Sequence, residues 1–284
     1  MKIGIDSYCY HRYFGEVYDG IEKPAKYKMS LEDFLKRAIE LGVDGVSLET
    51  CFIPSFEESY LKKIREIMDE GNLEAVVAWG HPNGLEGGKN KEALKDMEKH
   101  FRTCKILGVD ILRMVGSSLA FRHEPHLPQI KKISKMLKDS VKMAEEKGIK
   151  LVIENHFDFE TDEILIIVNN LDSEYFGVTF DSGNCFRYGE DPVMSAKKLS
   201  KYIFATHIKD VAPLRGGNPK DWFYYACTPI GKGVVNIPGI VEVLEQENYQ
   251  GLFAVEIDFL DPKFGDDTDK AVAESIEFLK KLKK

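Results

Sequence analysis

Short apolar runs alternate with longer amphipathic segments along the chain. The apolar runs have the length of strands buried on both faces, and the amphipathic segments have the periodicity of helices. This pattern predicts strands over residues 2–6, 45–49, 73–79, 109–115, 149–154, 176–181, 202–207 and 252–256. It predicts helices over residues 30–41, 56–70, 89–107, 126–147, 160–171, 238–247 and 271–282, and a further helix that begins at Asp191-Pro192.

The regular alternation of strand and helix predicts an α/β fold with parallel strands joined by right-handed crossovers. Eight such units without a duplicated Gly-rich loop favour a closed (β/α)8 TIM barrel over an open, doubly wound sheet. No shift in composition marks a second domain, so residues 1–284 are predicted to form a single TIM-barrel domain. The long segments 8–29 and 209–236 follow strands at their carboxyl ends. They are therefore expected to be loops on the rim of the active-site face.

Composition narrows the classes of function. The hydrophobic fraction is 43% and the formal net charge is −8, which describes an ordinary soluble protein and argues against a nucleic-acid surface. Five Cys without a CxxC spacing indicate reduced thiols, and no signal peptide is visible, so a cytoplasmic location is expected. No apolar stretch is long enough to span a membrane. A Tyr-rich segment 8–29 could pack on its own barrel or on a second subunit, which leaves a homo-oligomer open.

Four predicted strands end in groups that bind divalent cations. These groups are Glu154, Asp181, His207 and Glu256, and the strands that carry them are consecutive. Because neighbouring barrel strands bring their ends together at one rim, the four side chains are expected to converge. Three carboxylates and one imidazole suit one divalent ion, with Mn²⁺ as the first choice and Mg²⁺, Co²⁺ or Zn²⁺ as alternatives. The alternative for each residue alone is an ordinary polar strand end.

Further polar residues near the predicted strand ends are candidates for substrate binding. Arg113 lies on a buried strand and needs an acidic partner, such as Glu154, or an anionic ligand. The other candidates each have a plain alternative as solvent-facing, loop or ion-paired residues, and they are Glu49, His81, His156 and Lys209.

Five short motifs, in this order and in this strand context, resemble the xylose-isomerase-like TIM barrel superfamily of sugar isomerases and epimerases over nearly the whole chain. They are IEN at 153–155, FDSGN at 180–184, THIKD at 206–210, PIGKG at 229–233 and VE at 255–256. The resemblance to ketose 3-epimerases implies that Glu154, Asp181, His207 and Glu256 ligate one divalent metal. It also implies that Glu154 and Glu256 face opposite sides of a substrate carbon, which suits deprotonation and reprotonation.

The same resemblance implies that Glu160 and Arg215 contact the substrate. Asn184 is a departure, because those epimerases have a substrate-binding His at this position. The endonucleases of the wider fold group use a His-rich three-metal site, and the His-poor set of this chain makes a DNA-repair role unexpected.

These observations predict a divalent-metal-dependent isomerase or epimerase that acts through an enediolate on a ketose or an oxidised sugar. One alternative is a metal-dependent lyase, either a decarboxylase or a dehydratase of a keto-sugar acid, since both share the same enolate chemistry. An alternative from another class is a catalytically silent barrel that binds sugars. The expected partner is in each case a small carbohydrate.

Overall fold

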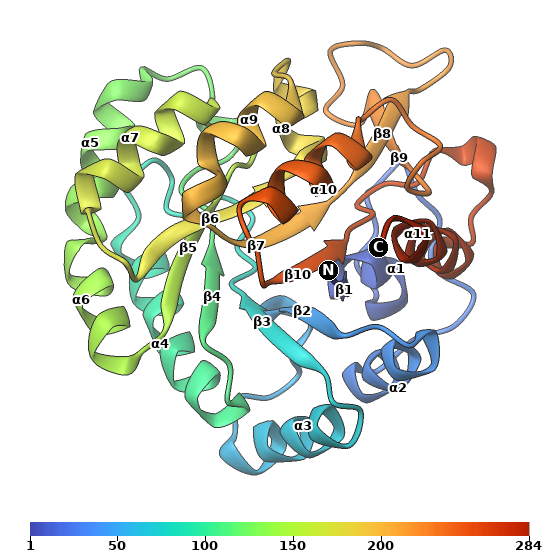
Figure 1. The fold of residues 1–284 in the computed structure, drawn as a ribbon, viewed down its shortest axis with the longest axis horizontal. Coiled ribbons are helices and arrows are strands. Elements are labelled where there is room, and N and C mark those ends of the chain that lie inside the picture. The colour runs from blue at the N-terminus through green and yellow to red at the C-terminus, as the bar shows by residue number, and fades with distance from the viewer. Residues whose placement is uncertain (284) are drawn as a thin grey trace.

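Eight parallel strands close into one barrel within residues 1–283, which are the residues that this computed structural model describes (Figure 1). The order around the barrel is β1-β10-β7-β6-β5-β4-β3-β2. Each barrel strand therefore lies beside the barrel strands that precede and follow it in the sequence. The predicted TIM barrel is therefore confirmed. The barrel strands are β1 (Lys2–Asp6), β2 (Gly45–Glu49), β3 (Glu74–Ala78), β4 (Ile111–Met114), β5 (Lys150–Glu154), β6 (Phe176–Asp181), β7 (Ile203–Ile208) and β10 (Leu252–Val255).

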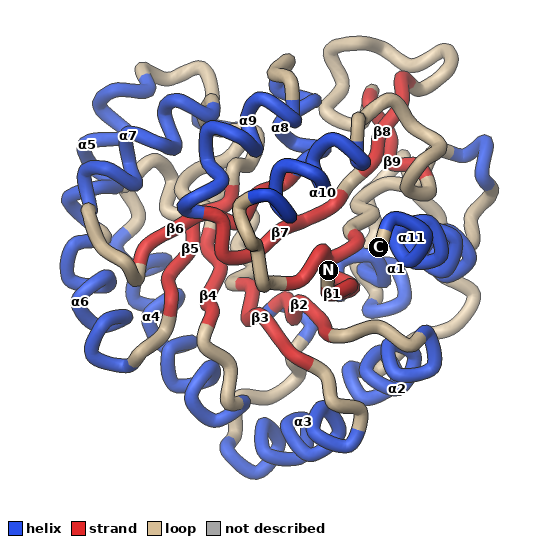
Figure 2. Tube along the Cα trace, viewed as in Figure 1, coloured by secondary structure: helices blue, strands red, loops and turns tan. Residues whose placement is uncertain are grey.

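Helices surround the barrel and cover the outer faces of its strands (Figure 2). The apolar residues of the strands and the inner faces of the helices form one continuous core, because each strand is covered on one face by helices and on the other by the barrel interior. The helices are α1 (His11–Phe14), α2 (Leu31–Leu41), α3 (Glu58–Glu70), α4 (Lys91–Leu107), α5 (His126–Met136), α6 (Lys138–Lys147), α7 (Thr161–Leu171), α8 (Ser182–Tyr188), α9 (Pro192–Leu199), α10 (Ile237–Gln246) and α11 (Thr268–Leu282).

The predicted helix over 126–147 is divided into α5 and α6 at Leu137. The hydroxyl of Ser134 donates to the carbonyl of Ile130 one turn earlier, at 2.8 Å. Such back-bonding from a serine side chain commonly bends a helix, and Leu137 itself is fully buried. The prediction of one continuous helix was therefore wrong at this point.

Both long rim segments contain secondary structure that the hydrophobic pattern did not predict. Residues 8–29 include the short helix α1, and residues 209–236 include the antiparallel hairpin of β8 (Asp210–Pro213) and β9 (Tyr225–Thr228). The helix α8 also follows β6 without a break, and Asp181 caps its first turn by accepting from the backbone N–H of Asn184. The carboxyl end of β6 is thus held rigidly by the helix that leaves it.

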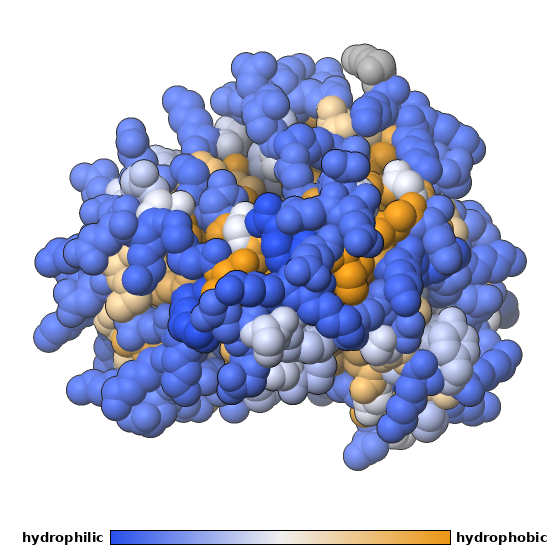
Figure 3. Space-filling view, turned by 90° about the horizontal axis from the view of Figure 1, so that it is seen from below, coloured by the Kyte–Doolittle hydropathy of each residue, from blue (hydrophilic) through white to orange (hydrophobic). Residues whose placement is uncertain are grey.

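The face seen in Figure 3 is largely hydrophilic, with apolar side chains in small patches. Among residues 1–283, no helix has both the length and the apolar character that crossing a membrane requires.

Candidate metal centre and active site

The four cation-binding residues predicted from the strand ends lie together inside the mouth of the barrel. Glu154 and Asp181 end β5 and β6, His207 lies near the end of β7, and Glu256 follows β10 directly. These strands are consecutive around the barrel. One ligand atom from each residue lies within 4.8 Å of the other three, and all four residues are buried. The closure of the barrel therefore brings together side chains that are far apart in the sequence.

Several ligand atoms of this group have no hydrogen-bond partner. Asp181 Oδ2, His207 Nδ1 and Glu256 Oε2 are buried without a hydrogen bond. His207 Nδ1 lies 2.7 Å from Glu256 Oε2, but the angles do not make a hydrogen bond. Buried polar atoms that converge without satisfying one another fit a cation between them, because an unpaired buried polar atom is costly. The donor set suits a divalent ion.

Lys209 is a buried cation that contacts this group directly. Its Nζ lies 3.0 Å from Asp181 Oδ2, 3.1 Å from Glu256 Oε1 and 2.9 Å from Asp258 Oδ2. Burial by itself would lower the pKa of Lys209, but these three carboxylates raise it well above its ordinary value. Burial also raises the pKa of Asp181 to about 7, although Lys209 acts in the opposite direction. Lys209 is therefore charged, and it offsets part of the negative charge of the ligand group.

Arg113 provides the second buried cation. It forms an ion pair with Glu154, and its Nη1 lies 3.2 Å from Glu49 Oε1. Burial raises the pKa of Glu49 to about 8, even though Arg113 lowers it. The sequence suggested either an acidic residue or an anionic ligand as the partner of Arg113. In the structure its guanidinium faces two acidic residues, Glu154 and Glu49.

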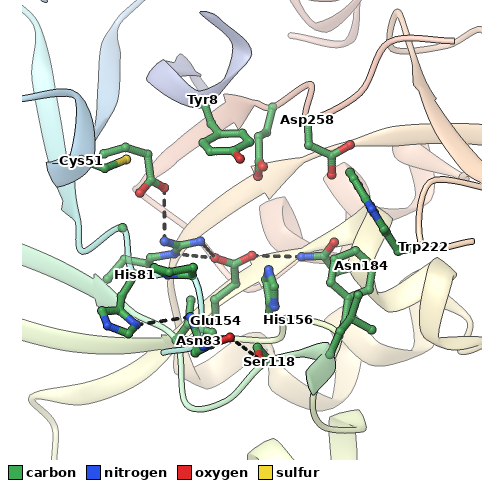
Figure 4. A pocket seen from close by; sticks show the side chains of 18 of the residues that line it. Tyr8, Cys51, His81, Asn83, Ser118, Glu154, His156, Asn184, Trp222 and Asp258 are labelled. Atoms are coloured by element: carbon green, nitrogen blue, oxygen red, sulfur yellow. Dashed lines mark hydrogen bonds and ion pairs between the residues drawn. The ribbon is translucent and has the colours of Figure 1, made fainter. Parts of the chain in front are cut away.

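A cavity of about 510 Å³ opens directly over the ligand group (Figure 4). Burial lowers the pKa of His156 to about 4, so its imidazole is uncharged. Asn184 Nδ2 donates to Glu154 Oε1 at 3.0 Å, so this amide holds a ligand carboxylate in place. Eight of the predicted residues line the cavity, and they are Glu49, His81, Arg113, Glu154, His156, Asn184, Lys209 and Glu256.

Two residues that the resemblance placed at the substrate lie elsewhere. Glu160 is exposed and precedes α7, where Glu163 accepts from its backbone N–H at 2.9 Å. Arg215 is exposed in the turn between β8 and β9. Neither lines the cavity. Glu160 is turned outward because it caps a helix, and Arg215 is carried away from the barrel by the hairpin that the sequence pattern did not reveal.

Other residues of the site were missed by sequence reasoning. Asp258 lines the cavity two residues beyond Glu256, and it pairs with both Lys209 and Arg187. Asp6 ends β1 and lies 3.3 Å from His207 Nε2. Both follow the same pattern of an acid at or just beyond a strand end, and this signal could have found them.

The two rim segments meet beside the cavity through their aromatic side chains. Tyr18 and Trp222 both line it, and their rings pack edge to face with centroids 4.9 Å apart. Arg187 Nε donates to the carbonyl of Tyr225 at 2.9 Å, which ties the β8–β9 hairpin to the buried Asp258. Aromatic side chains therefore line one part of the cavity, beside the charged residues that line another.

A family model described as "Xylose isomerase-like TIM barrel" matches residues 35–282. The chain belongs to this family. The resemblance stated from the five motifs is thereby confirmed. An inosose dehydratase of Mesomycoplasma hyopneumoniae (strain J) is 23% identical over 279 residues, and the alignment covers 89% of each chain.

Two solved structures share the fold over 99% of this chain. A D-tagatose 3-epimerase-like protein superposes with a TM-score of 0.73 at 20% identity and is covered over 97% of its length. The IOLI protein, solved with a bound zinc atom, superposes with a TM-score of 0.76 at 19% identity and is covered over 98%. At these identities the likeness establishes the fold.

Proposed function

We propose that this chain is a divalent-metal-dependent lyase that removes water from an uncharged polyhydroxy ketone. The observation that carries the proposal is the pair Lys209 and His156, which line the cavity together with Glu154 and Glu256 of the ligand group. They add two proton-transfer groups to the carboxylates. The name of the relative, inosose dehydratase, supports the dehydratase reading over the isomerase and epimerase reading that the sequence favoured.

The protonation states of the two groups give them different roles. His156 is uncharged and can accept a proton, whereas Lys209 is charged and can donate one. A divalent ion held by Glu154, Asp181, His207 and Glu256 would supply polarisation of the substrate carbonyl. His156 then takes the proton from the carbon beside the carbonyl. Lys209 gives its proton to the hydroxyl on the next carbon as the C–O bond breaks, and the products are water and an unsaturated ketone.

The charges around the cavity favour an uncharged substrate over a keto-sugar acid. The two lining cations, Arg113 and Lys209, are already paired with carboxylates. The lining carboxylates outnumber them and are Glu16, Glu49, Glu154, Glu256 and Asp258. Because neither lining Arg nor lining Lys is free of a carboxylate partner, an anionic substrate would find no unpaired Arg or Lys side chain to bind it, which favours an uncharged substrate.

A specific observation also supports an epimerase as the second candidate. Glu154 at the end of β5 and Glu256 just after β10 both line the cavity, so two carboxylates could address one substrate carbon. In that reaction the proton returns to the other face of the carbon and no water is lost.

Solvent deuterium exchange distinguishes these functions. The Mn²⁺-loaded protein is incubated in D₂O with inosose, a panel of ketoses and a panel of keto-sugar acids, and the products are followed by NMR and ultraviolet absorbance. Loss of water from a neutral ketone, with a new conjugated absorbance, is expected. Exchange without loss of water would instead support the epimerase. Binding without exchange would support a silent sugar-binding barrel, and turnover of the acids alone would contradict the uncharged substrate.

The roles of the two proton-transfer groups are tested by His156→Gln and Lys209→Met. Each variant is expected to lose turnover by roughly 10²- to 10⁴-fold, the range typical of a general acid or base. Normal dehydration by His156→Gln would contradict the assignment of the base.

A further inference from the structure

The two carboxylate oxygens of Asp6 have different surroundings. Oδ1 accepts from the backbone N–H of Tyr8 at 2.6 Å and so caps the turn that follows β1. Oδ2 makes no hydrogen bond, and the whole residue is 0% exposed. The cap of this turn accounts for the position of Oδ1 but not for that of Oδ2. A buried carboxylate oxygen without a role would be costly, so the position of Oδ2 needs another explanation.

Oδ2 faces the imidazole of His207, whose Nε2 lies 3.3 Å away. The other ring nitrogen, Nδ1, faces the ligand group and lies 2.7 Å from Glu256, 3.6 Å from Glu154 and 3.9 Å from Asp181. One nitrogen of His207 therefore faces the carboxylates that would share a cation with it, and the other faces Asp6. This arrangement follows from the closure of the barrel, because β1 and β7 are the two neighbours of β10.

We propose that Asp6 is a positioning residue that fixes His207 as an Nδ1 ligand of the divalent ion. A carboxylate can only accept a hydrogen bond, so Asp6 favours the tautomer that carries its proton on Nε2. That tautomer leaves the Nδ1 lone pair free for a cation. Carboxylates that hold the second nitrogen of a ligating histidine in this way set both its tautomer and its ring orientation. The inference rests on the metal site of the proposed function, but not on which reaction the site performs.

The sharpest variant is Asp6→Asn, which keeps the shape and changes one acceptor to a donor. If the amide oxygen keeps the hydrogen bond from Tyr8, the NH₂ group faces His207 Nε2. An NH₂ group there either meets the Nε2 proton or forces that proton onto Nδ1, where it blocks the lone pair. The reversed amide would place its NH₂ against the N–H of Tyr8, which is equally unfavourable. The expected result is Mn²⁺ binding about 10- to 100-fold weaker than in the wild type, measured by titration calorimetry.

Asp158→Asn is a matched control. Asp158 is also buried, its Oδ1 also accepts a backbone N–H, from Phe159 at 3.0 Å, and its Oδ2 also lacks a hydrogen bond. Among residues 1–283, the ion pairs of His207 are with Asp6, Glu154, Asp181 and Glu256, and Asp158 is not among these partners. This control should bind Mn²⁺ as the wild type does, because it changes a buried acid to an amide without altering a partner of His207.

Equal Mn²⁺ affinity of Asp6→Asn and the wild type would overturn the inference, while the metal site itself would stand. A wild type that binds no Mn²⁺ would overturn both. If Asp6→Asn does not fold, ¹⁵N-histidine NMR of the Zn²⁺-loaded wild type decides the question. A slowly exchanging proton on Nε2 of His207 is expected, and a proton on Nδ1 would overturn the inference.

Discussion

At the scale of single residues, the site is a balance of buried charges. Glu154, Asp181 and Glu256 meet at one point, and Arg113 and Lys209 approach them from two sides. Buried carboxylates this close together are tolerated only with cationic partners. Arg113 and Lys209 both offset charge in this balance, and both line the cavity. Any substitution in the group should therefore change metal binding and chemistry together.

Glu256→Gln is expected to fold but to lose turnover by roughly 10²- to 10⁴-fold. The amide keeps the size of the side chain and removes both its negative charge and its ability to accept a proton. Steady-state kinetics with the substrate found by the exchange experiment, together with circular dichroism, would measure this. The same change at the exposed Glu160, which lies outside the cavity, should have little effect. Turnover of Glu256→Gln close to that of the wild type would contradict a role in catalysis or metal binding.

At the scale of elements, the barrel strands were predictable and the additions to the barrel were not. Strands such as β5 are buried on both faces, so their apolar runs stand out in the sequence. The hairpin β8–β9 lies outside the barrel and α8 has only 7 residues, so neither has a long periodic pattern. The four strand ends predicted the group of Glu154, Asp181, His207 and Glu256, whereas Asp6 was missed, although it also is an acid at the end of a strand.

The hairpin also depends on one buried acid that the sequence analysis noted only as part of a motif. Asp210 accepts from the backbone N–H groups of Gly231, Gly233 and Val235, at 2.9, 2.8 and 3.1 Å. A Cβ on Gly233 would lie 2.1 Å from Asp210 Oδ1, so only glycine permits this approach. The backbone of the segment PIGKG thus surrounds the carboxylate of Asp210 and donates hydrogen bonds to it.

Asp210→Ala should lower the free energy of unfolding by roughly 2–5 kcal/mol, because three backbone N–H groups, including that of the buried Val235, lose their acceptor together. Chemical denaturation would measure the loss, and limited proteolysis should cut residues 209–236 first. Asp210→Asn retains one acceptor oxygen, so its free energy of unfolding should lie between those of Asp210→Ala and the wild type. An unchanged denaturation midpoint for Asp210→Ala would show that the loop is held by other contacts.

At the scale of the whole molecule, the ligand group connects one half of the barrel. Its four residues lie on β5, β6 and β7 and directly after β10, and these strands are neighbours in that order, whereas β1, β2, β3 and β4 contribute none. Arg113 on β4 and Glu49 on β2 extend the network by ion pairs. A divalent ion would therefore act as a cross-link between distant parts of the chain, in addition to any role in chemistry.

Removal of divalent metal should destabilise the protein, and the strands that carry the ligand group should be destabilised more than the other strands. An ion that binds the folded state alone adds about 2.7 kcal/mol at a concentration 100 times its Kd, which corresponds to a rise in Tm of roughly 4 to 5 °C for a chain of 284 residues. Thermal unfolding in EDTA and in Mn²⁺ measures this difference. Hydrogen exchange should quicken in EDTA mostly at the carboxyl ends of β5, β6, β7 and β10.

The Glu256→Gln variant provides the internal comparison, since a lost ligand should reduce the gain in Tm that Mn²⁺ gives. An equal gain in the variant and the wild type would mean that the ion binds elsewhere, for instance to exposed acids on the surface of a protein with a net charge of −8. Faster exchange spread evenly over all eight strands would likewise point to a general salt effect. The uneven pattern is required by the geometry, because only strands that share the ion lose a cross-link when it is removed.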